Sequence, residues 1–294
     1  MKPAPFTYHD PRTVEEAVGL LGSLDNARVL AGGQSLMPMM NFRYAQPDHL
    51  IDLNRVVAMS GISVDKGAIL FGAMTRQREI EFSPHVSEVC PILQAALVHV
   101  GHRQTRNRGT IGGSLCHFDP SAELVNCVCV HDGAVLKARS RRGERTLAMS
   151  DFAVGYMTHG LAPDEILCSI SLPLWSPRHG YAYVEVARRR GDFAIAGVAA
   201  LIETEGRGGA IKRAALSVAG VCQIPVRPHA AEAALIGERP SQELFEAAAS
   251  ASEFPDPLSD AYVSADYRRH LAQVLIRRAL SAAADKAEER WADA

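Results

Sequence analysis

The stretch Ala27-Arg-Val-Leu-Ala-Gly-Gly-Gln-Ser35 decides how the beginning of the chain folds. Its first half is β-prone and predicts a short strand, and the pair Gly32-Gly33 lets the backbone turn tightly and expose its N–H groups. Before this stretch, residues 13–24 predict an amphipathic helix capped by Thr13, and after it residues 49–53 predict a second strand. Residues 1–56 therefore read as a small βαβ unit, with a candidate site at its strand-to-loop junction.

A second glycine pair, in Thr110-Ile-Gly-Gly-Ser114, has the same design as the first, because each segment ends in a hydroxyl residue. Backbone without side chains lets a phosphate approach closely, and successive N–H groups form a concavity that binds anions. Two such loops can grip the two halves of a pyrophosphate. Either pair taken alone more often makes only a tight turn, and neither fits the dinucleotide or P-loop glycine patterns.

Three arginines lie in the segment His102 to Arg108, directly before the second pair. They favour a strip that neutralises a bound anion, and a solvated surface strip stays open as the alternative. The sequence predicts a long irregular segment from Gly101 to Leu115, a feature that is more often functional than idle. Gly191-Asp-Phe193 is a further polar cluster, whose aromatic ring either covers a flat ligand or belongs to the core.

Three side chains after the second pair, those of His117, Asp119 and Glu123, invite a metal-site interpretation. They lack the spacing and the further ligand that a metal needs, so a carboxylate that hydrogen-bonds a ribose or a loop amide is favoured and no metal is predicted. No Ser-His-Asp, Cys-His or paired-carboxylate arrangement has local support, so we nominate no catalytic residue.

Strand and helix patterns place the rest of the chain in the α+β class. Residues 61–64 and 68–73 predict strands and residues 91–100 a helix, and proline and glycine at 173–180 mark a boundary. Beyond it, the sequence predicts a three-stranded antiparallel sheet with helices on one face. The predicted strands are 181–187, 196–203 and 214–221, the predicted helices are 230–236, 241–252 and 267–284, and the polar tail 286–294 is expected to fray.

Composition excludes several classes of protein. The 294 residues carry 31 Lys and Arg against 33 Asp and Glu, a net charge of −2 that supplies no field for holding nucleic acid. The six cysteines fit no zinc or iron–sulfur spacing and are typical of reduced thiols in the cytoplasm. We find no secretory signal and no run apolar enough for a membrane span.

Several long motifs, in order along nearly the whole chain, resemble the FAD-binding medium subunit of the molybdenum hydroxylases, the family of xanthine dehydrogenase and carbon monoxide dehydrogenase. The motifs are Phe6-x-Tyr8-x-x-Pro11, Ala31-Gly-Gly-Gln-Ser-Leu36, Pro47-x-His-Leu-Ile-Asp-Leu53, Gly72-Ala-Met-Thr75, Arg106-Asn-Arg-Gly-Thr-Ile-Gly-Gly-Ser114, Asp164-Glu-Ile-Leu167 and Arg188-Arg-Arg-Gly-Asp-Phe193.

This resemblance implies a p-cresol methylhydroxylase-type FAD-binding fold in residues 1–175, with α/β subdomains at about 1–56 and 57–175, and a C-terminal domain at 178–285. It also implies which residues hold FAD. Two glycine segments would bind the pyrophosphate, and four separate positions would contact other parts of the cofactor. The implied residues are Val29, Leu30, Ala31, Gly32, Gly33, Gln34, Ser35, Leu36, Val100, Thr110, Ile111, Gly112, Gly113, Ser114, Glu123, Leu167 and Phe193.

The chain departs from the family at two places. Glu123 stands where several members have aspartate, which keeps the carboxylate and lengthens its reach. Some members have a lysine at or beside Val184 and Glu185, and this chain has none there, which leaves Arg188 or Arg189 as candidates to replace it.

The resemblance further implies partners and a role. A large subunit with a molybdenum–pterin cofactor would hydroxylate the substrate, a small subunit with two [2Fe–2S] clusters would relay electrons, and this chain's FAD would pass them to an acceptor, in a dimer of heterotrimers. The sequence around Gln104 and Ser114 is closer to members that act on N-heteroaromatic compounds. A stand-alone FAD oxidase of the same broad fold and a non-enzymatic nucleotide-binding module are the alternatives.

Overall fold

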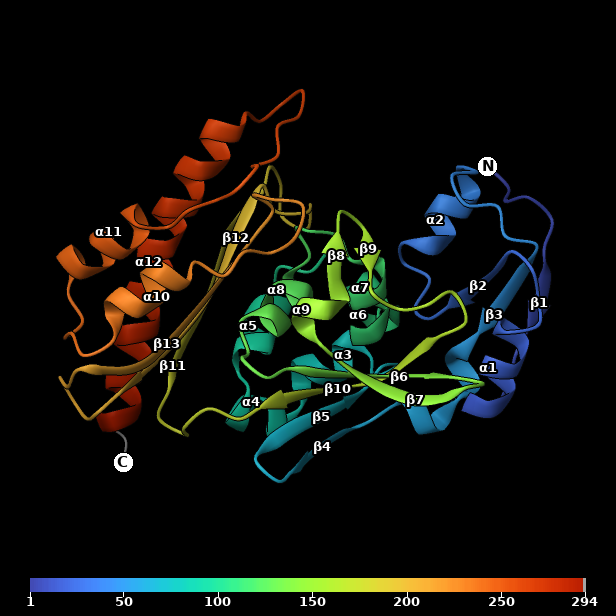
Figure 1. Ribbon diagram of the computed structural model, residues 1–294, viewed down its shortest axis with the longest axis horizontal. Helices are drawn as coiled ribbons and strands as arrows, with labels where there is room; N and C mark the ends of the chain where they lie inside the picture. Colours follow the sequence, from blue (N-terminus) through green and yellow to red (C-terminus); the bar gives the residue numbers. More distant parts are fainter. Residues whose placement is uncertain (293–294) are drawn as a thin grey trace.

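The N-terminal unit is a three-stranded parallel sheet with two helices beside it (Figure 1). The computed structural model describes residues 1–292. The strand order is β1-β3-β2, and β3 pairs in parallel with both neighbours. The elements are β1 (Thr7–His9), α1 (Val14–Leu21), β2 (Ala27–Leu30), α2 (Leu36–Asn41), β3 (His49–Asp52) and the 3-10 helix η1 (Leu53–Arg55).

Local sequence explains the helix α1. The Thr13 hydroxyl accepts a hydrogen bond from the Glu16 amide at 3.1 Å and so caps the first turn. The consecutive residues Ala17 and Val18 of this helix are buried, and Ile51 in the central strand β3 is completely buried. The helix and the strand therefore bury apolar side chains in one core, which extends beyond the N-terminal unit to residues such as Phe71.

The central unit is a five-stranded antiparallel sheet with short helices and a small hairpin, β8–β9, packed on it. The strand order is β4-β5-β10-β6-β7, and the core beside the sheet contains Phe71, Phe118 and Phe152, all fully buried. The elements are η2 (Val57–Met59), β4 (Ile62–Asp65), β5 (Ala68–Gly72), α3 (Gln77–Phe82), α4 (Pro84–Val89), α5 (Ile92–Leu97), α6 (Arg103–Arg108), α7 (Ile111–His117), α8 (Glu123–Cys129), β6 (Val135–Ser140), β7 (Gly143–Ala148), α9 (Met149–Phe152), β8 (Ala153–Gly155), β9 (Thr158–His159) and β10 (Ile166–Pro173).

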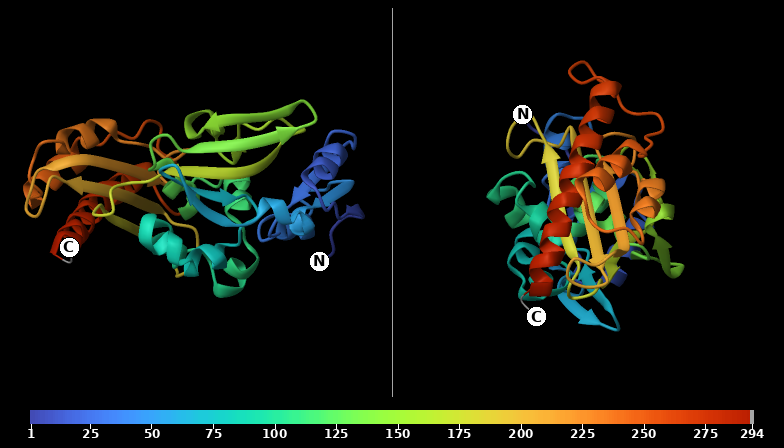
Figure 2. Two further views of the ribbon diagram at one scale, coloured as in Figure 1. Left: turned by 90° about the horizontal axis from the view of Figure 1, so that it is seen from below. Right: turned by 90° about the vertical axis from the view of Figure 1, so that its left-hand side faces the viewer.

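The C-terminal unit is a three-stranded antiparallel sheet, β11-β12-β13, crossed by one long helix, α12 (Figure 2). The elements are β11 (Gly180–Val186), β12 (Ala196–Thr204), β13 (Ile211–Ala219), α10 (His229–Leu235), α11 (Gln242–Ser250) and α12 (Ala265–Ala292). This sheet and its helices agree with the sequence-based prediction. Across residues 1–292, no helix combines the length and the apolarity needed to cross a membrane.

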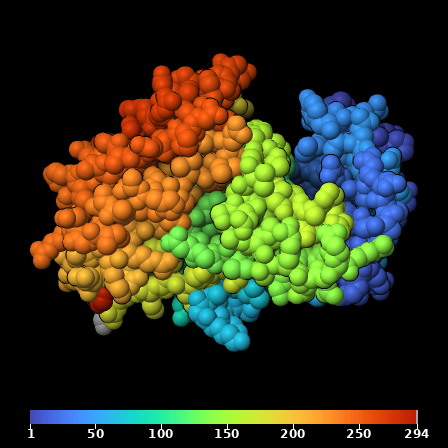
Figure 3. Space-filling model, in the orientation of Figure 1, coloured from blue at the N-terminus to red at the C-terminus, as the bar shows by residue number. Residues whose placement is uncertain are grey.

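The strand β12 is buried on both faces. Val198 and Ala200 pack into the core beneath the C-terminal helices, whereas Ala199 and Leu201 pack into the core of the central unit. Alternate side chains of a strand point to opposite faces, so this one strand joins the two cores. In Figure 3 the central unit lies between the N-terminal and C-terminal units, with a notch between the β8–β9 hairpin and the N-terminal unit.

Two sequence-based predictions are wrong. Residues 101–115, predicted to be irregular, contain the helix α6 and most of α7. The tail predicted to fray from Lys286 continues α12 through Ala292, because Ala287 is buried and the Trp291 indole donates to the Thr204 hydroxyl at 3.1 Å. Residues 293 and 294 lie outside the described part of the chain.

Candidate functional site

The first glycine segment, residues 29–36, runs from the end of β2 into α2. Gly33 has a φ of 71°, in the left-handed region that favours glycine. The backbone amides from Gly32 to Ser35 have no acceptor among residues 1–292, and the Gln34 side chain donates to the Gly32 carbonyl at 3.0 Å. The segment therefore presents successive N–H groups that can donate to a bound anion.

The second glycine pair lies in the first turn of α7 rather than in an open loop. The amide of Ile111 donates to the Thr75 carbonyl at 3.1 Å, and that of Gly112 donates to the Ala73 carbonyl at 2.8 Å. The Gly113 amide donates to the Thr110 hydroxyl at 3.0 Å. The expectation of a second loop with free amides is thus wrong, because these N–H groups already bond to the turn that follows β5 and to the helix cap.

The structure brings the two glycine segments into direct contact. A methyl group on Gly32 would overlap the Arg108 carbonyl and lie 2.8 Å from the Cα of Gly109, so only glycine lets the backbones meet. A methyl group on Gly113 would lie 3.4 Å from the Ala31 Cβ. The two segments therefore lie against each other, and the free amides of the first together with the glycine backbone of the second form one cradle.

Contacts place three of the four separate candidate positions beside neighbouring segments. Leu167 is buried on β10, where the next residue, Cys168, accepts from the Ala73 amide at 2.9 Å beside Gly112. Val100 and Phe193 belong to a second group, because the loop between β11 and β12 touches residues 101–102 at Gly191. The Phe193 ring is 55% exposed. Within residues 1–292, neither Phe193 nor Glu123 forms a hydrogen bond with the glycine segments.

The arginine strip divides between structural and exposed side chains. Arg106 is committed to the fold, because its guanidinium donates to the Glu81 carboxylate at 3.0 and 3.2 Å. Arg103 and Arg108 are exposed on α6. Of the two candidates for the family lysine, Arg188 lies over the Tyr262 ring at 5.2 Å and Arg189 pairs with a neighbouring carboxylate.

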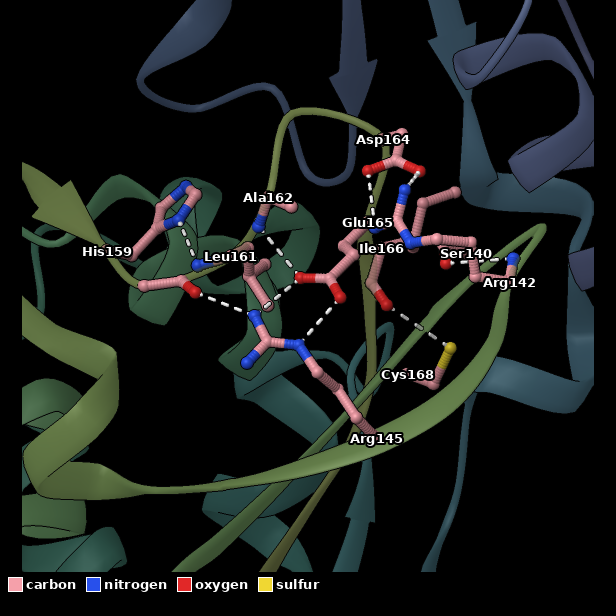
Figure 4. Close-up of polar contacts among 11 residues, drawn as sticks. Ser140, Arg142, Arg145, His159, Leu161, Ala162, Asp164, Glu165, Ile166 and Cys168 are labelled. Atoms are coloured by element: carbon pink, nitrogen blue, oxygen red, sulfur yellow. Dashed lines mark hydrogen bonds and ion pairs between the residues drawn. The ribbon is translucent and has the colours of Figure 1, made fainter.

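Ion pairs hold the segment that leads into Leu167 (Figure 4). The Arg145 guanidinium donates to both Glu165 oxygens, at 2.6 and 2.7 Å, and to the Gly160 carbonyl at 2.8 Å. The Ala162 amide donates to the same carboxylate at 2.7 Å, and these partners hold the pKa of Glu165 below its usual range. Arg142 donates to Asp164 at 2.9 Å. These contacts anchor the segment directly before β10, the strand that carries Leu167.

Comparisons with known proteins decide the family. A family model described as the FAD binding domain in molybdopterin dehydrogenase matches residues 4–175, more than half of the chain. A second, described as the CO dehydrogenase flavoprotein C-terminal domain, matches residues 181–283. The chain belongs to the FAD-binding medium subunits of the molybdenum hydroxylases. It is accordingly an oxidoreductase subunit, and its cofactor is FAD.

Relatives of this medium subunit match over nearly their full length. Caffeine dehydrogenase subunit beta from Pseudomonas sp. (strain CBB1) is 34% identical and is covered over 97% of both chains. Nicotine 6-hydroxylase medium subunit from Paenarthrobacter nicotinovorans is 38% identical, covering 95% of this chain and 98% of the relative. Among solved structures, carbon monoxide dehydrogenase from Hydrogenophaga pseudoflava aligns with a TM-score of 0.91 and 36% identity, covering 97% of this chain and 99% of that chain.

The residues of the cradle fit the diphosphate of FAD. Successive free amides at Gly32 to Ser35 supply donors for phosphate oxygens. Glycine at position 113 lets the second segment come close to the first, because a Cβ there would lie 2.8 Å from the Thr110 hydroxyl and 3.4 Å from the Ala31 Cβ. The Thr110 hydroxyl accepts from the Gly113 amide and keeps its own hydrogen available to donate. Within residues 1–292, no cluster of three or more His, Cys, Asp or Glu side chains is arranged to hold a metal ion.

Glu123, at the start of α8, is a buried carboxyl group of the FAD-binding medium subunit. Only 4% of it is exposed, and burial, with the negative charges of Glu185 and Asp119 nearby, raises its pKa from 4.5 to about 8. The folded chain therefore keeps Glu123 protonated at neutral pH, while the unfolded chain ionises it. The protonated carboxyl can donate a hydrogen bond, which a carboxylate cannot.

This difference makes stability depend on pH. Between about pH 4.5 and 8 the unfolded chain binds fewer protons at Glu123, so the stability contribution falls as pH rises through that window. We expect the free energy of unfolding of Glu123→Gln to rise relative to that of the wild type as pH rises. The difference between the two proteins should be about 2 to 4 kcal/mol larger at about pH 9 than at about pH 5. Urea unfolding of the FAD-free chain at both pH values measures this, with the exposed Glu88→Gln as control. An unchanged difference at the two pH values would contradict the assignment.

Proposed function

We propose that the chain is the FAD-binding electron-transfer subunit of a heterotrimeric molybdenum hydroxylase. The observation that carries this proposal is the single cradle made by the two glycine segments, with free amides on one side and bare backbone on the other. Bound FAD would supply the redox chemistry, taking electrons from [2Fe–2S] clusters of a partner and giving them to an external acceptor. The chain's own residues bind and orient the cofactor, and the residues named as its site above remain part of this proposal.

The proposed partners are a large molybdenum–pterin subunit and a small [2Fe–2S] subunit, assembled as a dimer of heterotrimers. Support comes from relatives named as a beta subunit and a medium subunit. Relatives named for caffeine and nicotine also support an N-heteroaromatic substrate, which the large subunit would hydroxylate. The assay that decides the substrate is turnover of the co-purified complex with heteroaromatic compounds, with carbon monoxide as the contrasting substrate.

The proposal includes a fold family and domain limits. Residues 1–175 would be a p-cresol methylhydroxylase-type FAD-binding domain with subdomains at about 1–56 and 57–175, followed by a C-terminal domain at 178–285. The separate sheets and the two family matches, at 4–175 and 181–283, support this division. Six free cysteines favour a cytoplasmic location, where thiols stay reduced.

The first test is cofactor content. We expect the full chain, purified with any subunits that co-purify, to be yellow and to release FAD on denaturation. A colourless, folded preparation that takes up no FAD would overturn the proposal. Anaerobic mixing separates the stand-alone oxidase: we expect heteroaromatic substrates to bleach the flavin of the complex and leave the flavin of the isolated chain oxidised. Direct bleaching of the isolated chain would support the oxidase instead.

A further inference from the structure

Two side chains bridge the glycine segments from the side, at the junction of the N-terminal and central units. Asn54, in η1, donates from Nδ2 to the Ala31 carbonyl at 3.0 Å, which lies in the first segment. Arg76, before α3, donates from Nη2 to the Asn54 Oδ1 and from Nη1 to the Arg108 carbonyl. That carbonyl is the one that a Cβ on Gly32 would overlap. The bridge therefore runs through two side chains from the first glycine segment to the last residue of α6, just before the second segment.

The Asn54 end of the bridge is held rigidly. Its backbone amide donates to the Asp52 Oδ1 at 2.9 Å, and its side-chain amide donates to the same oxygen. The other Asp52 oxygen accepts from the Tyr8 hydroxyl at 2.6 Å. β1, β3 and η1 thus fix the Asn54 amide before it reaches Arg76, and a side chain fixed in this way loses little entropy when it bonds.

The Arg76 end of the bridge depends on shape more than on charge. Its guanidinium is half-buried, and both oxygens that accept from it, the Arg108 carbonyl and the Asn54 Oδ1, are neutral. Among residues 1–292 it forms no ion pair with a carboxylate. Burial and the nearby Arg108 lower its pKa, and Glu79 and Asp52 act in the opposite direction. A planar guanidinium can reach two acceptors at once, whereas a lysine ammonium on the same backbone is a single point donor. Arginine is therefore the residue that can span this gap.

We propose that Asn54 and Arg76 form a clamp that sets the spacing between the two glycine segments and so determines how tightly the chain holds a dinucleotide diphosphate. They are positioning residues, since they act through the backbone of Ala31 and Arg108. The inference rests on the proposed function, because it takes FAD as the ligand of the cradle. It adds that affinity depends on two residues outside the glycine segments.

The test compares FAD dissociation constants of Asn54→Ala, Arg76→Gln and Arg76→Lys with the wild type, measured by flavin fluorescence at low and high salt. We expect each variant to bind FAD about tenfold or more weakly, with a similar loss at both salt concentrations. The double variant Asn54→Ala with Arg76→Gln should lose little more FAD affinity than either single variant, because each substitution breaks the same bridge. Arg78→Gln is the matched control. Arg78 lies two residues after Arg76, in α3, and its guanidinium donates to Glu81 at 3.0 Å rather than to the bridge.

The outcomes separate the clamp from a simple charge effect. If Arg76→Lys binds as well as the wild type while Arg76→Gln loses affinity mainly at low salt, the charge matters and the clamp is wrong. Near-wild-type affinity in Asn54→Ala also overturns it. Melting temperatures of the FAD-free variants show whether the fold is kept, and Asn54→Ala decides the matter if Arg76→Gln fails to fold. If the wild type itself takes up no FAD, the proposed function fails instead.

Discussion

Gly32→Asp is expected to weaken FAD binding by about a hundredfold or more, so that the variant retains no flavin through gel filtration. The new side chain would overlap the Arg108 carbonyl, and this overlap would push the two glycine segments apart. Its carboxylate would also repel the diphosphate. Flavin retained after gel filtration, quantified by absorbance, measures the effect. Gly32→Ala isolates the steric part, because it adds the Cβ without the charge, and we expect it to lose most of the affinity as well.

The matched control is Gly19→Ala in α1. A methyl group there meets no atom within 4 Å, and alanine favours the helix, so FAD content should stay at the wild-type level. Wild-type FAD content in Gly32→Asp would contradict the cradle. A loss of flavin in Gly19→Ala would mean that the assay reports general damage to the N-terminal unit.

Gly180→Ala is expected to destabilise the C-terminal unit by about 3 kcal/mol or more. Gly180 begins β11, directly under α12, and a methyl group there would overlap the Ala283 carbonyl and lie 2.7 Å from the Ala287 amide nitrogen. The helix would have to move away from the sheet along its last turns. Urea unfolding followed by circular dichroism measures the change.

A glycine in the same unit provides the comparison. Gly206, between β12 and β13, has open space where its Cβ would be, so Gly206→Ala should change stability by less than about 0.5 kcal/mol. Equal stability of Gly180→Ala and the wild type would show that α12 does not pack on β11 as closely as the structure places it.

Local patterns in the sequence predict most of the strands, because the signals for these strands lie in residues that are adjacent in the sequence. The strand before Gly32 is such a case, and the start of the helix α1 at Thr13 follows from local sequence in the same way. The helix at residues 286–292 was missed since its residues are mostly charged, and it is stabilised by distant partners such as Thr204. The first turn of α7 was missed because two glycines read as a loop, while its amides bond to residues before α3.

The candidate site divides in the same way. The two glycine segments are visible in the sequence, and the structure brings them together. Asn54 and Arg76 are not predicted, because their bonds join residues that are 22 and 32 positions apart. The Glu79 carboxylate, which accepts from the Arg76 backbone amide at 3.0 Å, is a local signal at this position, but it predicts only a helix start.

The strand β12, buried on both of its faces, has a consequence for how the chain can be divided. Tyr183, Ala199, Leu201 and Ala215 complete the core of the central unit, although they come from the C-terminal unit. A chain cut after residue 175 would leave that apolar surface open to water, and exposed apolar surface of this kind promotes aggregation. We therefore expect the two halves to unfold as one cooperative block, and the smallest soluble piece that keeps the flavin site to include β11, β12 and β13.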